Sequence, residues 1–312
     1  MAQETSEFDV IIIGGGPGGL SAAFWCVGLG LNAVLLEEQS EFGGQLLRTY
    51  NPVKDHLGAV AANGRDMRDI FLRQIEDAGV VRRCGSAVLK AQLAEKKVVL
   101  ADDVEYSAFA IVIATGVSRR RLGVPGEAEF AGRGVLLSGV KDKASVTGKR
   151  VAVVGGGDAA LENALILSED AAHVFVVHRR SELSGRSEFV ERCCQEAKIE
   201  LLLNSEVAAI IGNTTVEGVL VKNRATGLSN KISVDAVLIR VGEVPNTDLF
   251  TGQVELDQRG FIKINSDCST SLANVYAIGD VASPNTPTIS GAVGMGATAA
   301  KSIMARLKGR NG

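Results

Sequence analysis

The sequence has no marked excess of charge of either sign. Lys and Arg number 33 and Asp and Glu number 36, which gives a net charge of −3. We therefore expect no basic face and no nucleic-acid partner. The sequence also lacks an apolar run long enough to cross a bilayer, and its polar, acidic start lacks the basic and apolar segments of a secretory signal. These absences predict a cytoplasmic protein with no membrane span.

Cysteine and histidine are both scarce. The five cysteines form no CxxC motif, and the three histidines show no spacing typical of metal ligands. Cys193 and Cys194 are adjacent in a segment that we expect to be helical. Neighbouring side chains on a helix point about 100° apart, so a disulfide between them needs unusual backbone geometry. We therefore expect reduced thiols, as is usual in the cytoplasm, and no metal site.

Glycine, by contrast, is abundant: there are 36 among 312 residues, a length sufficient for two domains. Many glycines lie in two copies of one pattern, in which a short apolar strand, a glycine loop, a helix and a second apolar strand follow each other. The expected elements are strand 9–13, helix 18–30 and strand 33–37 in the first copy, and strand 150–154, helix 158–168 and strand 173–177 in the second.

Each copy is followed by segments of the same kind. Residues 80–108 and 206–232 contain short alternating stretches broken by polar turns, which predict small antiparallel meanders. A buried strand then returns at 109–116 in the first half and at 235–242 in the second. The halves therefore indicate one α/β architecture used twice, at an offset too long for a solenoid repeat.

A third segment follows the second half. Residues 274–280 predict a strand, and the apolar, glycine-rich stretch from Thr288 to Leu307 predicts a helix with Thr288 or Ser290 near its N-cap. No third glycine loop accompanies this segment, so we expect it to complete one of the two domains.

The first glycine loop has the pattern of a dinucleotide site. Gly14, Gly16 and Gly19 fit GxGxxG after a strand, with Pro17 at the start of the helix. Glycines let the backbone approach a pyrophosphate, and the helix N-terminus offers N–H donors to it. Glu37 follows Gly19 by 18 residues. A carboxylate at the end of the second strand suits an unmodified ribose diol, as in FAD.

The second loop fits the GxGxxA variant but ends in basic residues, which suit the 2′-phosphate of NADPH. A solvated basic strand end is the alternative interpretation. The residues that we expect at NADPH are Gly155, Gly157, Asp158, Ala159, Ala160, His178, Arg179 and Arg180.

Four further motifs carry a family resemblance. They are Gly-Gly-Gln-Leu at 43–46, Ala-Thr-Gly at 114–116, Pro-Asn-Thr at 245–247 and Ala-Ile-Gly-Asp at 277–280. In order and spacing, over essentially the whole chain, they resemble the low-molecular-weight thioredoxin reductase family. The resemblance implies two Rossmann-like three-layer α/β domains and a homodimer. An NADPH domain, 118–245, is expected as an insertion in an FAD domain formed by 1–117 and 246–312.

The resemblance also implies contacts with FAD. Asp280 would hydrogen-bond the ribityl chain, and the following helix would point its N-terminus at the flavin pyrimidine ring, where reduced flavin carries negative charge. The residues expected at FAD are Gly14, Gly16, Pro17, Gly19, Glu37, Gly44, Gln45, Ala114, Thr115, Gly116, Gly279, Asp280, Thr288 and Ile289.

The sequence departs from the family where the chemistry is decided. Members that reduce thioredoxin resemble one another in a CxxC before the second loop, and those two positions fall on Ser138 and Lys141 here. Neither residue can form a disulfide. Asp142, which occupies the position of the acid after the CxxC, is therefore given no proton-transfer role. The family's Arg-Gln pair before the last helix falls on Pro287 and Thr288.

The resulting hypothesis is an NADPH-dependent FAD oxidoreductase that passes electrons from the flavin directly to an external acceptor. Ferredoxin, a quinone, a partner protein or a small molecule remain open as acceptors. Two alternatives are kept: a disulfide reductase that uses other cysteines, and a flavin-binding sensor with little turnover. Ordinary thiols are the favoured interpretation of Cys193 and Cys194, and a surface-loop histidine is that of His56.

Overall fold

The computed structural model describes residues 6–283, 285 and 287–310. The chain forms two compact units, one made of Met1–Ser118 with Val244–Gly312 and the other of Arg119–Glu243. The sequence placed these divisions after residues 117 and 245. Where the chain passes between the units, strands β7 (Val117–Arg119) and β16 (Glu243–Pro245) pair with each other.

The first unit is built on a seven-stranded sheet with the order β3-β2-β1-β6-β5-β4, in which β17 also pairs with β6. The pairs that join β1, β2, β3, β6 and β17 are parallel, whereas β4, β5 and the start of β6 are antiparallel. The strands are β1 (Ser6–Ile13), β2 (Ala33–Leu36), β3 (Val81–Arg83), β4 (Val88–Gln92), β5 (Lys97–Leu100), β6 (Glu105–Ile113) and β17 (Val275–Ala277).

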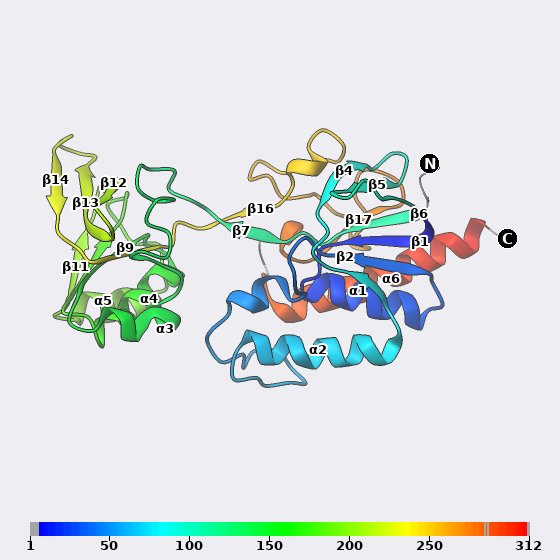
Figure 1. The fold of residues 1–312 in the computed structure, drawn as a ribbon, viewed down its shortest axis with the longest axis horizontal. Helices are drawn as coiled ribbons and strands as arrows, with labels where there is room; N and C mark the ends of the chain where they lie inside the picture. The colour runs from blue at the N-terminus through cyan, green and yellow to red at the C-terminus, as the bar shows by residue number, and fades with distance from the viewer. Residues whose placement is uncertain (1–5, 284, 286, 311–312) are drawn as a thin grey trace. The chain divides into compact units, whose positions relative to one another are not determined.

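Three helices cover one face of this sheet (Figure 1): α1 (Pro17–Gly28), α2 (Gly64–Ala78) and α6 (Ile289–Arg310). Successive residues of a strand point to opposite faces. Val10 and Ile12 of β1 accordingly pack against α1 and α6, whereas Ile11 and Ile13 pack on the side of β4 and β5. Both faces are buried at residues 10–13, which explains why this part of β1 is a continuous apolar run in the sequence.

The second unit repeats this plan around a parallel sheet of order β11-β10-β9-β15-β8. Helix α4 packs on one face, and an antiparallel sheet of β12, β13 and β14 packs on the other (Figure 1). The elements are β8 (Val135–Leu136), α3 (Gly139–Asp142), β9 (Arg150–Val154), α4 (Asp158–Ser168), β10 (His173–Val177), α5 (Ser187–Gln195), β11 (Ile199–Leu202), β12 (Ser205–Gly212), β13 (Val216–Asn223), β14 (Ser229–Ile232) and β15 (Ala236–Ile239).

The predicted α/β class, with two three-layer Rossmann-like domains, is confirmed. One element was placed wrongly: β3, which we expected in the first meander, pairs in parallel with β2 and extends the main sheet. Its sequence, Val-Arg-Arg, is too short and too polar to carry the signal of a buried parallel strand.

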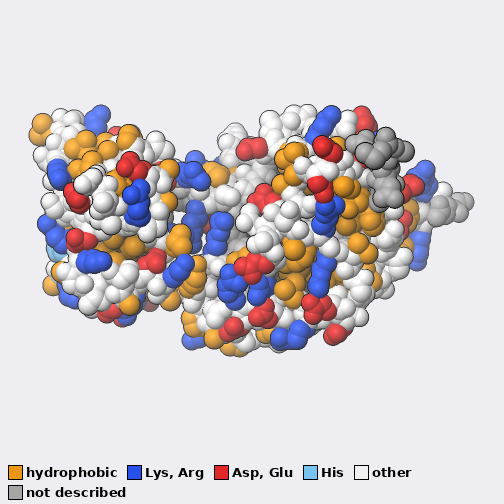
Figure 2. All heavy atoms as spheres, viewed as in Figure 1, with side chains coloured by type: hydrophobic (Ala, Val, Ile, Leu, Met, Phe, Trp, Pro, Cys, Tyr) orange, Lys and Arg blue, Asp and Glu red, His pale blue; other side chains and the backbone are white. Residues whose placement is uncertain are grey.

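Charged side chains of both signs are interspersed over the face of each unit that Figure 2 shows, in agreement with the small net charge. Among the helices of the described residues, none has both the length and the apolar character needed to cross a bilayer. The same residues contain no cluster of His, Cys, Asp and Glu that could hold a metal ion.

Candidate functional site

The carboxyl ends of four parallel strands meet at one edge of the first sheet. Backbone hydrogen bonds join the residues that follow them: Gly14 N donates to Leu36 O (2.8 Å), Ala114 N to Ile13 O (2.8 Å) and Ile278 N to Ile113 O (2.9 Å). The glycine loop, the Ala-Thr-Gly segment and the Ile-Gly-Asp segment therefore lie side by side, although about 160 residues separate the last two in sequence.

The first glycine of the loop is required by its surroundings. Gly14 has φ of 110°, and a Cβ there would overlap the carbonyl oxygen of Ala114. The 3₁₀ turn Gly44–Arg48 also reaches this loop, because a Cβ on Gly44 would come within 3.0 Å of Gly16 Cα. The loop is thus packed closely against two other segments, and it leads into the N-terminus of α1, whose N–H groups can bind a phosphate.

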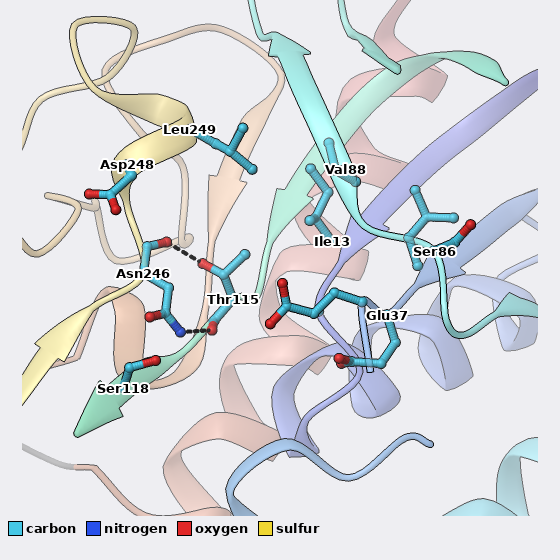
Figure 3. A pocket seen from close by; sticks show the side chains of 12 residues that line it. Ile13, Glu37, Ser86, Val88, Thr115, Ser118, Asn246, Asp248 and Leu249 are labelled. Carbon is cyan, nitrogen blue, oxygen red and sulfur yellow. Dashed lines mark hydrogen bonds between the residues drawn. The ribbon is translucent and has the colours of Figure 1, made fainter. Parts of the chain in front are cut away.

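Glu37 lies under the loop rather than at the surface. Only 7% of it is exposed. Its Oε2 accepts a hydrogen bond from Gly15 N (2.7 Å) and its Oε1 accepts one from Gln39 N (2.9 Å). Each carboxylate oxygen keeps a second lone pair, so the side chain can also accept from ribose hydroxyls. Glu37 lines a cavity of about 310 Å³, called here the first cavity (Figure 3).

The opposite wall of the first cavity ties the two chain segments of this unit together. Thr115 Oγ1 donates to Asn246 O (2.8 Å), and Asn246 Nδ2 donates to Thr115 O (2.7 Å), as the dashed lines of Figure 3 show. Gln45 Nε2 reaches Val117 O at 2.5 Å. The Ala-Thr-Gly and Pro-Asn-Thr motifs are thus two halves of one wall.

Helix α6 begins at Ile289, directly after Thr288, which is one of the two caps that we predicted; the other, Ser290, lies inside the helix. Thr288 Oγ1 accepts a hydrogen bond from Gly291 N (3.0 Å), which makes Thr288 the N-cap. Ile289 packs against a small cluster that includes Leu46. His56 Nδ1 lies 3.0 Å from Ser290 Oγ, so the loop that carries His56 reaches the start of this helix. Gly279 and Asp280 form a 3₁₀ turn just after β17.

The second glycine loop repeats the geometry of the first. Gly155 N donates to Val177 O (3.0 Å), and Arg240 N donates to Val154 O (2.7 Å). Gly155 has φ of 142°, and a Cβ there would overlap the carbonyl oxygen of Arg240. Gly157 is the N-cap of α4, whose first helical residue is Asp158. These residues line a cavity of about 850 Å³, called here the second cavity, together with Ala159 and Ala160.

His178 takes the place in the second unit that Glu37 takes in the first. It is 7% exposed, and a Cβ on Gly156 would overlap its ring. Burial lowers its pKa, helped by the nearby charges of Arg180 and Arg179, while a hydrogen bond with the backbone of Glu182 acts in the opposite direction. The imidazole is therefore neutral at pH 7. Its Nε2 is buried and has no hydrogen-bond partner among the described residues.

Several arginines line the second cavity. Arg179 and Arg180, which we predicted, are exposed there. Arg120, Arg121 and Arg240 line it as well and were missed. The signals were present in the sequence: a run of three arginines at the expected crossing between domains, and an arginine within an otherwise apolar returning strand.

Asp158 is already engaged. Its two carboxylate oxygens accept from Arg186 N (2.7 Å) and Arg186 Nε (2.9 Å). This ion pair holds a negative charge at the start of α4, where the helix dipole favours it.

The segment around Ser138 and Lys141, where the family resemblance places the CxxC, contains no cysteine. Ser138 is buried and precedes the short helix α3, in which Lys141 lies. Asp142 Oδ2 accepts hydrogen bonds from Leu137 N (2.6 Å) and Ser138 N (2.9 Å). The acid thus fixes the backbone of this turn.

All five cysteines are free. Cys26, Cys193 and Cys268 are buried, and desolvation raises the pKa of Cys26 to about 12 and that of the other two to about 11. The adjacent residues Cys193 and Cys194 point in different directions. Cys193 Sγ lies 3.6 Å from Leu161 O, whereas Cys194 is exposed. Buried thiols of raised pKa supply little thiolate at neutral pH.

The sequence matches the pyridine nucleotide-disulphide oxidoreductase family over residues 8–296. The chain belongs to this family. A thioredoxin reductase from Listeria monocytogenes is 34% identical over 300 residues, which cover 96% of this chain and 93% of that protein. A Clostridium pasteurianum relative, named for its size and place as the 34.2 kDa protein in rubredoxin operon, is 30% identical over 299 residues and 96% of each chain.

Solved structures of the family agree. The crystal structure of Lactococcus lactis thioredoxin reductase in the FR conformation matches with a TM-score of 0.84 at 30% identity, and the match covers 97% of this chain and 99% of that one. The protein is therefore a flavin-dependent NAD(P)H oxidoreductase of the thioredoxin reductase-like kind, with FAD and NADPH as cofactors.

Proposed function

We propose that this enzyme transfers electrons from NADPH through FAD directly to an external acceptor, with no dithiol of its own in the path. Hydride transfer between nicotinamide and flavin is the chemistry that the two cofactors supply when bound. The protein's part is to bind and orient them and to leave the flavin accessible to an acceptor.

The first cavity suits the adenosine half of FAD. Glu37, with its free lone pairs, would accept from the ribose hydroxyls, and Gly14 and Gly16 would let the diphosphate approach the N-terminus of α1. The start of α6, capped by Thr288, would present its remaining N–H groups to the flavin, in the position that the family resemblance implies for Asp280 and this helix.

The second cavity suits NADPH. Arg179 and Arg180 are exposed at the end of β10, where a 2′-phosphate would meet them. His178 lines the same cavity, and burial lowers the pKa of its ring. The neutral ring also avoids the repulsion that a carboxylate would exert on a phosphate at this position.

The observation that carries the proposal is the pair Ser138 and Lys141 at the positions of the family's CxxC. A flavin-to-thiol relay needs two sulfurs that form and break a disulfide, and neither side chain has one. Cys193 and Cys194 offer no substitute pair, because Cys193 is buried toward α4 while Cys194 faces solvent.

Electrons then leave the flavin for a separate molecule. The relative encoded in a rubredoxin operon gives a reason to include rubredoxin beside ferredoxin, thioredoxin, quinones and oxygen among the acceptors tested. Free thiols fit the reducing cytoplasm, where we place the enzyme. We also propose a homodimer, on the resemblance to the family.

A two-stage experiment tests the proposal. Anaerobic NADPH is added to the holoprotein and flavin absorbance is followed; bleaching is expected, and flavin that stays oxidised would indicate a sensor. Each acceptor is then supplied to wild-type protein and to the Cys193→Ala/Cys194→Ser variant, with Cys84→Ser as the matched control for an exposed thiol. Equal turnover of all three supports the proposal. A thiol pair that cycles with NADPH oxidation would refute it.

A further inference from the structure

Arg240 occupies a special place in the second unit. It follows β15, its N–H donates to Val154 at the end of β9, and its carbonyl lies beneath Gly155. Strand β9 is where the order of the sheet reverses, since α4 leads from β9 to β10 on one side while β15 lies on the other. Ligands of open α/β sheets bind at such a switch point, outside the carboxyl ends of the strands.

The two halves of the chain can be compared at this place. In the first unit, Ala114 makes the same two contacts, because its N–H donates to Ile13 and its carbonyl lies beneath Gly14. Arg240 is thus the counterpart of Ala114. The second unit carries a long cation where the first carries a methyl group.

The charge of Arg240 is poorly compensated. Its Nη1 and Nη2 donate to the carbonyls of Ile239 (2.8 Å) and Leu137 (2.6 Å), and Arg119 donates to the same Leu137 carbonyl (2.5 Å). The ion pairs found in the described part of the chain do not include Arg240.

Partial burial and the neighbouring Arg119 lower the pKa of Arg240 to about 10, against weaker opposite effects of Asp142 and Glu243. A half-buried cation without an ion-pair partner costs free energy. An anion that enters the second cavity would remove that cost.

The cavity provides the place for such an anion. Arg240 lines it together with the second glycine loop, and Arg179 and Arg180 line it from the end of β10. Because β9 lies between β10 and β15, the predicted 2′-phosphate contacts and Arg240 belong to opposite sides of the loop.

We propose that Arg240 is a positioning residue that pairs with the diphosphate of the nicotinamide dinucleotide, from the nicotinamide side of the second glycine loop. The proposal rests on the proposed function, in that NADPH must occupy the second cavity. It separates two tasks. Arg179 and Arg180 distinguish NADPH from NADH, whereas Arg240 holds the part that both nucleotides share.

The test compares three ligands by calorimetry on the oxidised holoprotein: NADP⁺, NAD⁺ and adenosine 2′-phosphate, which has no diphosphate. Arg240→Gln should weaken NADP⁺ and NAD⁺ by the same factor, about tenfold or more for the loss of a charged hydrogen bond. It should leave adenosine 2′-phosphate within twofold of wild type. The Arg179→Gln/Arg180→Gln variant should show the reverse: its affinity for NAD⁺ should be unchanged, and its affinities for NADP⁺ and adenosine 2′-phosphate should both fall.

Two further variants guard against a merely structural effect. Arg150→Gln removes a guanidinium from the opposite end of the same sheet and should change no affinity. Arg240→Lys keeps the charge and should retain more NADP⁺ affinity than Arg240→Gln. If Arg240→Gln weakened adenosine 2′-phosphate equally, or weakened NADP⁺ alone, or changed nothing, the assignment would be wrong. A wild-type protein that binds NADP⁺ but shows no flavin bleaching would refute the proposed function and leave this comparison to decide on Arg240.

Discussion

The carboxylate of Glu37 should stabilise the first unit even before it meets a cofactor. It accepts hydrogen bonds from Gly15 N and Gln39 N with one oxygen each. Glutamine has a single oxygen, so Glu37→Gln can keep only one of these bonds, and its NH₂ group would face the other N–H. Losing one charge-assisted hydrogen bond at this buried place costs about 1.5–3 kcal/mol.

That loss is large enough to measure. In a unit of roughly 150–250 residues, each kcal/mol lowers Tm by about 2–4 °C, so a decrease of about 3–12 °C is expected. The lost ribose acceptor should also raise the Kd for FAD about tenfold or more. Thermal unfolding of the FAD-free protein measures the first effect, and fluorescence titration with FAD measures the second.

Glu38→Gln is the matched control. Glu38 is the next residue, lines the same cavity and is exposed, and its Oε1 accepts a hydrogen bond from Gln39 Nε2 (3.1 Å). We expect a change below about 0.5 kcal/mol there, as for most surface substitutions. If Glu37→Gln, Glu38→Gln and wild type had the same Tm, the hydrogen bonds of Glu37 would not contribute the stability assigned to them.

Three further predictions concern the second unit. Arg179→Gln/Arg180→Gln should lower the ratio of kcat/KM for NADPH to that for NADH about tenfold or more, because charged contacts to the 2′-phosphate are lost; an unmoved ratio would contradict the cofactor assignment. Burial lowers the pKa of His178, so the unfolded chain binds its proton at higher pH than the folded one, and Tm should fall as the pH drops through about 6.5 toward 5.5. His178→Gln should flatten this dependence, and an equal slope in the variant would refute the argument. Gly156→Ala places a methyl group against the His178 ring and should weaken NADP⁺ binding, whereas Gly28→Ala, with open space around it, should not.

The sequence predicted what depends on short-range patterns. The two strand–loop–helix units, the antiparallel segments and the cap at Thr288 follow from apolar periodicity and local hydrogen-bonding chemistry, and they lie within a few residues of their expected places. Glu37 and His178 were singled out because the end of the second strand is a position of known meaning in such units.

What could not be predicted depends on contacts between distant segments. The parallel pairing of β3 with β2 is decided by the sheet and not by its three residues. Arg240 stands out in the sequence only as an arginine in an apolar strand, and its place at the second cavity appears only when its carbonyl is found beneath Gly155. The burial of His178 under the loop, which sets its neutral state, is likewise a product of packing.

The duplicated loop has a consequence for a cell that contains both cofactors at once. The buried side chain beneath the loop is the carboxylate of Glu37 in the first unit and the uncharged ring of His178 in the second. Under the proposed assignment, the carboxylate of Glu37 repels a 2′-phosphate from the first cavity. In the second cavity, the same phosphate meets Arg179 and Arg180. Exchanging Glu37 and the His178 ring would therefore remove the repulsion of a 2′-phosphate from the first half and create it in the second.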